Sequence, residues 1–207
     1  MVEEIRIYVE GGGDGKNTKA AFHEGMSRFL IELRQMAQAK KTKWKIIVCG
    51  SRSSTFRDFC NGNKSNPKAT NILLVDSESP VTGSTCSQHL DQQDKWNMSG
   101  INGDYVHLMV QVMESWIIAD VDALAAYYGN GFNRNAVPGN SNVEAIPKTS
   151  IESALNNATK STKKGKYHKI RHGPDILGQV SVPLVRNKAE HCDKLFNCIK
   201  ALINPTA

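Results

Sequence analysis

The stretch RIYVEGGGDGKNT, residues 6–18, joins an apolar run to a glycine-rich turn. A phosphate-binding P-loop requires a glycine, four residues, Gly-Lys and then Ser or Thr. Glu10 stands where the first glycine is required and Asn17 where the hydroxyl is required, while Lys16 takes the last glycine position of the dinucleotide pattern G-x-G-x-x-G. The alternative is that the glycines turn the chain away and leave Glu10 accessible at a strand end. The spacing favours this alternative, and nucleotide binding through the loop is the weaker hypothesis.

The apolar part of this stretch is the first of four predicted β-strands. Nearly continuous apolar runs of this length are typical of strands buried on both faces of a parallel sheet. The four runs are Ile5–Val9, Trp44–Cys49, Asn71–Asp76 and Tyr105–Gln111. Apolar residues at helical spacing separate them, so the first half has the order β-α-β-α-β with right-handed crossovers. We therefore expect an α/β fold, with a mostly parallel sheet of about four strands flanked by helices and a helical C-terminal part.

The segments between and after these strands predict the helices. One helix is expected between the first two strands, and a short helix capped by Ser53 or Ser54 is expected after the second. Further along we expect helices over 84–96, 112–128, Ile151–Ala158 and 188–203, and a loop rich in Asn, Gly and Pro over 130–147.

Length and composition favour one globular unit. The 207 residues are 40% hydrophobic, so we expect a single domain, with an α/β core over 1–128 and a loop, basic segment and helices over 129–207. No run of about 18 uncharged apolar residues occurs, and we expect a soluble cytoplasmic protein without membrane contact. The five cysteines are scattered without a CxxC pair, which favours free thiols in a reducing compartment.

Acidic residues follow two of the predicted strands. Glu10 ends the first strand, Asp76 ends the third, and Glu78 comes two residues later. The carboxyl ends of parallel strands meet at the sheet edge where ligands bind, and three carboxylates there repel one another unless a cation lies between them. Oxygen ligands favour Mg²⁺ or Mn²⁺. The alternative, that such acids cap helices, is weaker for the set of three than for Asp76 alone.

These residues resemble a known family. The strand ending in VEG, the following loop with an acid and the strand ending in LLVDSE resemble the Toprim domain of primases, topoisomerases and OLD-type nucleases. More closely, RIYVEGGGD, LLVDSE, HLMVQVMESWIIADVDALAAYYG and KYHKIRHGPDIL resemble a Toprim-like bacterial family, domain-of-unknown-function family 4276. The resemblance implies that Glu10 matches the Toprim glutamate and that Asp76 and Glu78 match its Asp-x-Asp pair. Glu78 departs from the usual second aspartate.

The resemblance also implies a partner. Members of such families frequently sit beside ABC- or SMC-like ATPases in anti-phage systems, which implies an ATPase subunit by association. The sequence leaves open whether the protein forms a homo-oligomer.

Further residues have weaker assignments near the expected site. Asp14 is a candidate to hold a second metal or its water shell. Glu114 and Asp120 follow the fourth strand, and because they lie six residues apart, one helix cannot aim both at one point. Glu114 is preferred as a metal ligand, and Asp120 is interpreted as a solvated or capping acid. His107, within an apolar strand, is expected in the core.

The formal charge of +6 is concentrated in residues 160–172, KSTKKGKYHKIRH, which contain no acid. Such a run is either a solvated loop or a footprint for a polyanion. His168 and His172 lie in the same segment, where Gly and Pro disfavour a helix, so both are assigned to a basic loop. Lys166 or Lys169 is a candidate to stabilise a pentavalent phosphate, the alternative being neutralisation of a nucleic-acid backbone. The residues expected to contact nucleic acid are Lys16, Lys163, Lys164, Lys166, Lys169 and Arg171.

Three classes of function remain. The first is a metal-dependent nuclease acting on DNA or RNA with Glu10, Asp76 and Glu78 as ligands, within a defence system with an ATPase partner. The second is a non-catalytic subunit that binds nucleic acid or a partner. The third is a nucleotide-binding enzyme that uses the glycine-rich loop.

Overall fold

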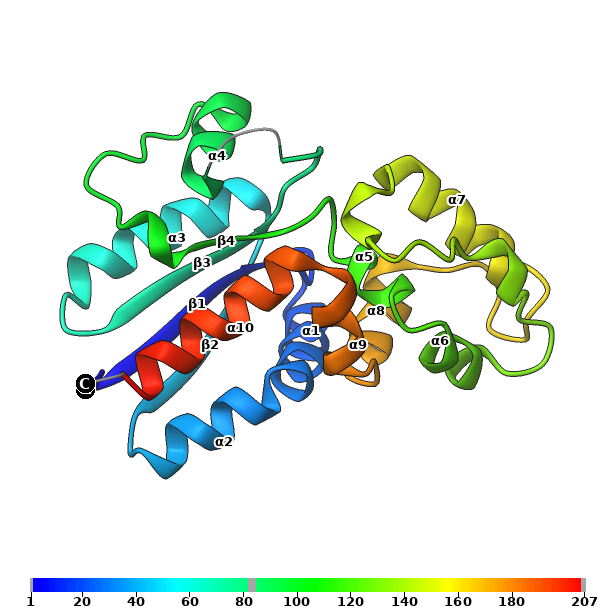
Figure 1. The fold of residues 1–207 in the computed structure, drawn as a ribbon, viewed down its shortest axis with the longest axis horizontal. Coiled ribbons are helices and arrows are strands. Elements are labelled where there is room, and N and C mark those ends of the chain that lie inside the picture. The colour runs from blue at the N-terminus through cyan, green and yellow to red at the C-terminus, as the bar shows by residue number, and fades with distance from the viewer. Residues whose placement is uncertain (1, 82–84, 206–207) are drawn as a thin grey trace.

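The computed structural model describes residues 2–81 and 85–205. Its centre is one parallel sheet with the strand order β2-β1-β3-β4. The strands are β1 (Glu4–Glu10), β2 (Lys43–Gly50), β3 (Thr70–Asp76) and β4 (Val106–Met109). The expected α/β class and four parallel strands are confirmed, with β4 shorter than its apolar run (Figure 1).

Helices cover both faces of the sheet and extend beyond the carboxyl ends of its strands. The α-helices are α1 (Lys16–Phe29), α2 (Ile31–Ala39), α3 (Arg52–Ser65), α4 (Cys86–Asp94), α5 (Glu114–Ile118), α6 (Val121–Tyr128), α7 (Lys148–Thr159), α8 (Lys169–Leu177), α9 (Val182–Lys188) and α10 (Glu190–Ile203). Three short 3-10 helices add η1 (Gly103–Tyr105), η2 (Arg134–Ala136) and η3 (Val143–Ala145). Among the described residues no helix is both long and apolar enough to cross a membrane.

Alternation along the strands creates two apolar layers. Ile5, Ile7 and Val9 of β1 pack in one cluster with buried residues of α1, α2 and α10, because side chains two apart point to the same face. Tyr8 and Leu73 point to the other face and pack with α3 and α4. Figure 1 shows α3 and α4 on one side of the sheet, α1 and α2 on the other, and α5 to α8 beyond the strand ends.

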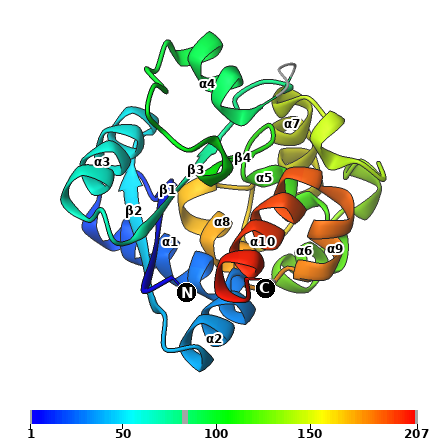
Figure 2. The same ribbon diagram turned by 60° about the vertical axis from the view of Figure 1, so that its left-hand side comes forward.

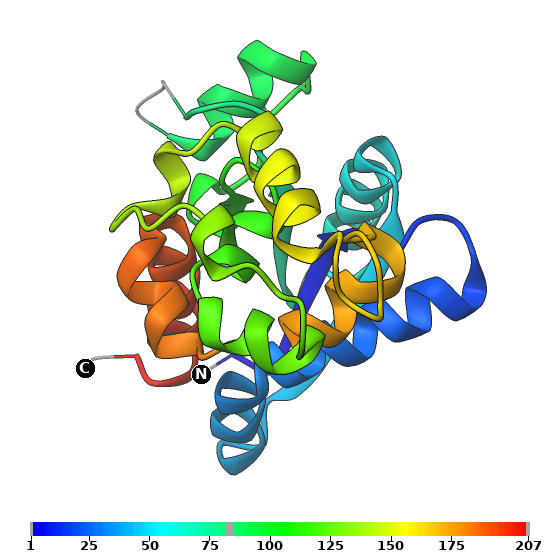
Figure 3. The same ribbon diagram turned by 90° about the vertical axis from the view of Figure 1, so that its right-hand side faces the viewer.

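The C-terminal part joins the core. Helix α10 packs against β4 and α2, and Figure 2 shows it lying beside α9. Figure 3 looks onto the helices beyond the strand ends, where the green, yellow and orange segments of α5 to α8 lie together. This helical group faces the sheet edge at which β1 and β3 end.

Two expected helices are each divided in the structure. The helix between the first two strands breaks at Leu30 into α1 and α2. The helix expected over 112–128 breaks before Asp120, whose carboxylate accepts the Ala123 N–H (3.0 Å) as the N-cap of α6. Similarly, Ser51 rather than Ser53 or Ser54 caps α3. At Asp120, a side chain that competes for helical N–H groups therefore starts a new helix inside an apolar periodic segment.

The expected basic loop over residues 160–172 was wrong in its second half, because α8 begins at Lys169 and continues through Gly173 and Pro174. The His168 side chain accepts the first free N–H groups of the helix. Packing against α1 outweighs the helix-breaking tendency of Gly173 and Pro174. The two helices lie so close together that a Cβ on Gly25 would come within 2.2 Å of the Pro174 carbonyl oxygen. A glycine at this position of α1 therefore permits the contact.

Candidate metal centre

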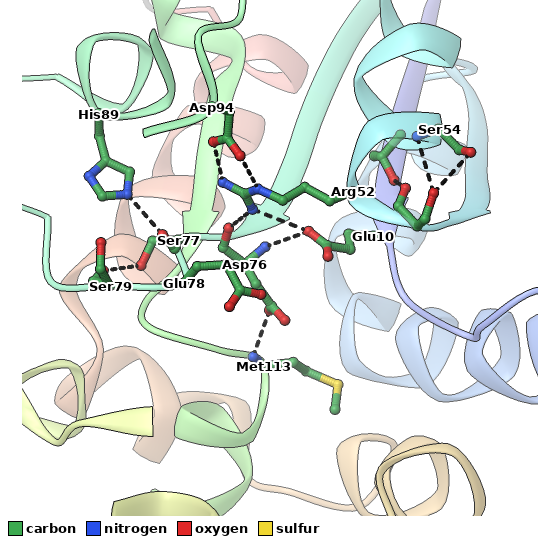
Figure 4. Close-up of polar contacts among 12 residues, drawn as sticks. Glu10, Arg52, Ser54, Asp76, Ser77, Glu78, Ser79, His89, Asp94 and Met113 are labelled. Carbon is green, nitrogen blue, oxygen red and sulfur yellow. Dashed lines mark hydrogen bonds and ion pairs between the residues drawn. The ribbon is translucent and has the colours of Figure 1, made fainter. Parts of the chain in front are cut away.

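Three carboxylates meet at the carboxyl edge of the sheet. Glu10 is the last residue of β1, Asp76 is the last residue of the neighbouring β3, and Glu78 follows in the next loop. One oxygen from each lies within 4.8 Å of the others. Figure 4 shows the three side chains converging from these two strand ends. The structure thus brings together the three residues that the sequence singles out.

The glycine-rich loop turns the chain away from the sheet directly after Glu10. Gly11, Gly12 and Gly13 all have positive φ (141°, 76° and 59°), which residues with a Cβ rarely adopt. A Cβ on Gly11 would also come within 2.5 Å of the Phe22 ring. Lys16 is exposed and is the first residue of α1.

Hydrogen bonds fix the orientation of the Asp76 carboxylate. This side chain is 4% exposed. Its Oδ1 accepts the Met113 N–H (2.8 Å) and its Oδ2 contacts Lys169 Nζ (3.1 Å). The neighbouring Glu10 Oε2 accepts the Asp76 N–H (3.2 Å). Asp76 therefore both binds a main-chain amide at the start of α5, as the capping alternative proposed, and contributes to the acidic group.

Burial and mutual repulsion destabilise the charged forms of these acids. Burial first, and then the charge of Asp76, raises the pKa of Glu10 to about 7. Burial also raises the pKa of Asp76 to about 6, with Lys169 opposing and Glu114 adding to the shift. A cation placed between the carboxylates would reverse this balance.

Arg52 binds the site from the start of α3, just after β2, the strand on the other side of β1. Its Nη1 donates to Glu10 Oε2 (3.3 Å) and to the Asp76 main-chain oxygen. Its Nε and Nη2 bind both oxygens of Asp94 (2.8 and 2.7 Å), and its guanidinium lies over the Trp96 ring at 5.1 Å. This fork, visible in Figure 4, ties Glu10 to the end of α4.

Lys169 places a positive charge beside the carboxylates. Its Nζ lies 3.1 Å from Asp76 Oδ2 and 3.5 Å from Glu114 Oε2. Burial would lower the pKa of Lys169, but the charges of Asp76, Glu114 and Glu10 outweigh burial and raise it. Lys169 is therefore a protonated cation at the site.

Glu114 takes part in the site through Lys169. Its side chain is buried, and the Tyr167 hydroxyl donates to its Oε1 (3.0 Å). Burial and the charge of Glu114 raise the pKa of Tyr167 well above its usual value, so this hydroxyl keeps its proton. Glu114 lies outside the group of three carboxylates, and it holds Lys169 in place from the opposite side.

Comparison with known proteins identifies the family. The family model described as "Domain of unknown function (DUF4276)" matches residues 9–200. The chain belongs to this family. No curated protein and no solved structure matches the chain. The matched part of this DUF4276 protein runs from β1 into α10 and includes all residues described at the site.

Other acids expected near the site are placed differently. Asp14 is exposed in the loop before α1 and lies outside the group of three. Asp120 is buried rather than solvated, and it accepts the Ala123 and Ser181 N–H groups (3.0 and 2.8 Å). It therefore caps α6 and ties the chain before α9 to it.

The basic residues of the segment 160–172 lie on α8 and in the stretch before it. Lys16, Lys163, Lys164, Lys166 and Arg171 are exposed, and Lys164 lies over the Tyr127 ring (4.7 Å). Of the two lysines proposed to act on a phosphate, Lys169 contacts the acidic site, whereas Lys166 lies in the exposed segment before α8.

The histidines of this segment have structural contacts. His168 caps α8, and its N–H donates to His172 Nδ1 (3.2 Å), which also contacts the Tyr128 hydroxyl (2.9 Å). His107 is buried as expected, and burial lowers its pKa to about 4.

Sequence reasoning missed a second lysine at the site, Lys148. It begins α7, and its ammonium pairs with Glu78 Oε2. The loop before α7 contains no strong motif, so the only sequence signal for Lys148 is its position at a helix start.

Two cavities open at the site. One of about 140 Å³ is lined by Glu10, Asp76, Lys169 and the glycine loop, and a larger one of about 320 Å³ adjoins Glu78 and Lys169.

Proposed function

We propose that this protein is a Mg²⁺- or Mn²⁺-dependent nuclease of the Toprim type, which cleaves phosphodiester bonds in DNA or RNA. The observation that supports the proposal is the convergence of Glu10, Asp76 and Glu78 within 4.8 Å at the carboxyl edge of a parallel sheet. Ligands of open α/β sheets bind at this edge. The order of the acids along the chain also resembles the Toprim pattern.

The donor set suits a hard divalent cation. All three candidate ligands are carboxylates, and oxygen ligands without His or Cys favour Mg²⁺ or Mn²⁺ over zinc. When bound, such a cation supplies a Lewis acid for a phosphate oxygen and lowers the pKa of a bound water. Asp76 is held in position by the Met113 N–H, and Glu10 is held by Arg52. The protein therefore preorganises two of the three ligands.

Lys169 is suited to bind the substrate phosphate. Its ammonium is half-exposed and lies between Asp76 and Glu114, so it can contact an anion that reaches the acidic group. A protonated amine fixed at this place stabilises the negative charge that develops on a phosphate in the transition state. The exposed lysines and Arg171 around α8 would neutralise more distant phosphates.

A nuclease assay tests this proposal. Wild-type protein is incubated with single-stranded and duplex DNA and RNA in Mg²⁺ or Mn²⁺, beside Glu10→Gln and Asp76→Asn. Asp122→Asn is the matched control, because Asp122 is an exposed acid on α6. We expect cleavage that both site variants abolish and the control retains. Cleavage that survives both site variants would contradict the metal-site assignment.

A second candidate function is a non-catalytic binding subunit. It is favoured by the ion pairs that Glu10 and Asp76 make with Arg52 and Lys169, since these partly neutralise the acids within the protein. Absence of cleavage together with nucleic-acid binding that survives Asp76→Asn would support this alternative.

We also propose an ABC- or SMC-like ATPase partner in an anti-phage system, as the family resemblance implies. Co-purification of the full chain with an ATPase encoded beside it, followed by the same cleavage assay with ATP, tests this association.

A further inference from the structure

A cavity of about 320 Å³ lies beside the acidic group and shares residues with it. Glu78 and Lys169, which belong to the candidate metal centre, also line this cavity. The rest of the wall comes from the start of α5, one face of α7 and Tyr167. A molecule bound in the cavity would therefore extend directly from a phosphate at the acidic group.

The cavity combines an apolar wall with polar groups. Val112, Ile151 and Leu155 are buried apolar residues that line it. Thr149 and Asn156 add side chains that both donate and accept hydrogen bonds. Planar heteroaromatic rings with polar edges match such a mixture, because their faces need apolar contact and their edges need hydrogen bonds. The side chains of this cavity therefore suit a nucleobase.

Two lysines lie where the cavity meets the three carboxylates. Lys148 pairs with Glu78 from the start of α7, and Lys169 pairs with Asp76 from the start of α8. Both side chains are about half-exposed, at 45% and 47%, so both can reach an anion. A phosphate between these ammonium groups would lie next to the acidic group, with its attached nucleoside directed into the cavity.

The size of the cavity restricts the substrate. Its volume lies at the lower end of the range of about 300–1,000 Å³ for small-molecule pockets, which admits one nucleoside and not a stacked base pair. Enzymes that hold a single base in a pocket act on unpaired strands or extrude the nucleotide from the duplex. Resting on the nuclease function proposed above, we propose that this cavity binds the nucleoside next to the scissile phosphate, so the substrate is an unpaired or flipped-out nucleotide.

Calorimetry with small ligands tests the cavity without requiring turnover. The titrants are a nucleoside 5′-monophosphate and deoxyribose 5-phosphate, each added to the full chain with Mn²⁺. Both carry the phosphate, and only the first carries a base. We expect the nucleotide to bind roughly tenfold more tightly, a difference within the range found for base stacking.

A pair of variants assigns this difference to the cavity. Asn156 is half-buried and lines the cavity, whereas Asn157 is the next residue of α7 and is exposed. Asn156→Phe fills the cavity from its rim and should remove the advantage of the nucleotide, while Asn157→Phe should keep it. Equal affinities for the two ligands in wild-type protein, or a nucleotide advantage that survives Asn156→Phe, would overturn the proposal.

The cleavage assay separates this inference from the proposed function. If both hold, wild-type protein cuts single strands faster than continuous duplex, and Asn156→Phe removes the preference. Cleavage of both substrates at equal rates, abolished by Asp76→Asn and unaffected by Asn156→Phe, would retain the nuclease and overturn the nucleoside cavity. Nucleotide binding that Asn156→Phe abolishes, without any cleavage, would retain the cavity and overturn the nuclease.

Discussion

Metal binding should stabilise the protein through Glu78 as well as through Glu10 and Asp76. The perturbation is Glu78→Gln, which removes a charge and a strong oxygen ligand while keeping the side-chain shape. The Glu78 side chain is 31% exposed, so this change puts the core at less risk than one at Asp76. Unfolding is followed by differential scanning fluorimetry during titration with Mn²⁺.

The size of the effect follows from linkage between binding and folding. A cation present at about 100 times its Kd stabilises the folded state by about 2.7 kcal/mol. For a chain of this size, each kcal/mol raises Tm by about 2–4 °C, so wild-type protein should gain about 5–10 °C. If Glu78→Gln weakens binding about a hundredfold, the same Mn²⁺ concentration leaves about 0.4 kcal/mol, and the rise in Tm falls to about 1 °C.

Controls separate this effect from general salt stabilisation. Asp122→Asn, at an exposed acid of α6 outside the group of three carboxylates, should show the wild-type shift, and excess chelator should abolish the shift in both proteins. Two results would refute the reasoning. One is a wild-type Tm that does not respond to Mn²⁺ at millimolar concentration, and the other is a full Tm shift in Glu78→Gln.

Three further predictions concern other parts of the chain. Arg52→Lys keeps the charge but loses the bidentate contact with Asp94. It should weaken Mn²⁺ binding by about tenfold. Unchanged Mn²⁺ binding in calorimetry would contradict a role of Arg52 in positioning Glu10. The pKa of His107 is about 4 in the folded protein, below the 6.5 of an unperturbed histidine, so the unfolded chain binds more protons between these values. This group should therefore lower the free energy of unfolding by roughly 3 kcal/mol as the pH drops from 6.5 to 4. In urea unfolding, His107→Gln should lack that loss. An equal dependence of the unfolding free energy on pH in the variant and the wild type would disprove the prediction. Lys16→Ala should leave the Mn²⁺ shift unchanged, whereas tight ATP binding abolished by this variant would support a nucleotide loop instead.

The fold and the three carboxylates could be predicted because their signals are local. Continuous apolar runs such as Ile5–Val9 indicate buried parallel strands, and parallel order alone places the residues after such strands at one edge. Glu10 and Asp76 needed no knowledge of packing to be brought together. Their convergence with Glu78 in the structure has the same origin.

The partners of these acids could not be predicted in the same way. Arg52 is separated by 42 residues from both Glu10 and Asp94, and Lys148 by 70 residues from Glu78. No periodicity or motif encodes such pairs. Arg52 nevertheless follows the end of β2, so the rule that located the acids would also have pointed to it had it been applied to cations.

The start of α8 shows how packing overrides a local signal. Gly173 and Pro174 disfavour a helix when considered alone, yet both lie inside α8. The close approach to Gly25 in α1 compensates for them, and it depends on a residue more than a hundred positions away. The same helix carries Lys169, so the error in secondary structure concealed which lysine reaches the acids.

The fork of Arg52 has a consequence for the evolution of the family. Its guanidinium joins the ends of β1, β3 and α4 through Glu10, the Asp76 main chain and Asp94. Loss of Asp94 alone would leave a partly buried arginine with one carboxylate fewer and free it to move. Positions 52 and 94 should therefore vary together among relatives, and those that have replaced both should have found another means of holding the glutamate of the first strand.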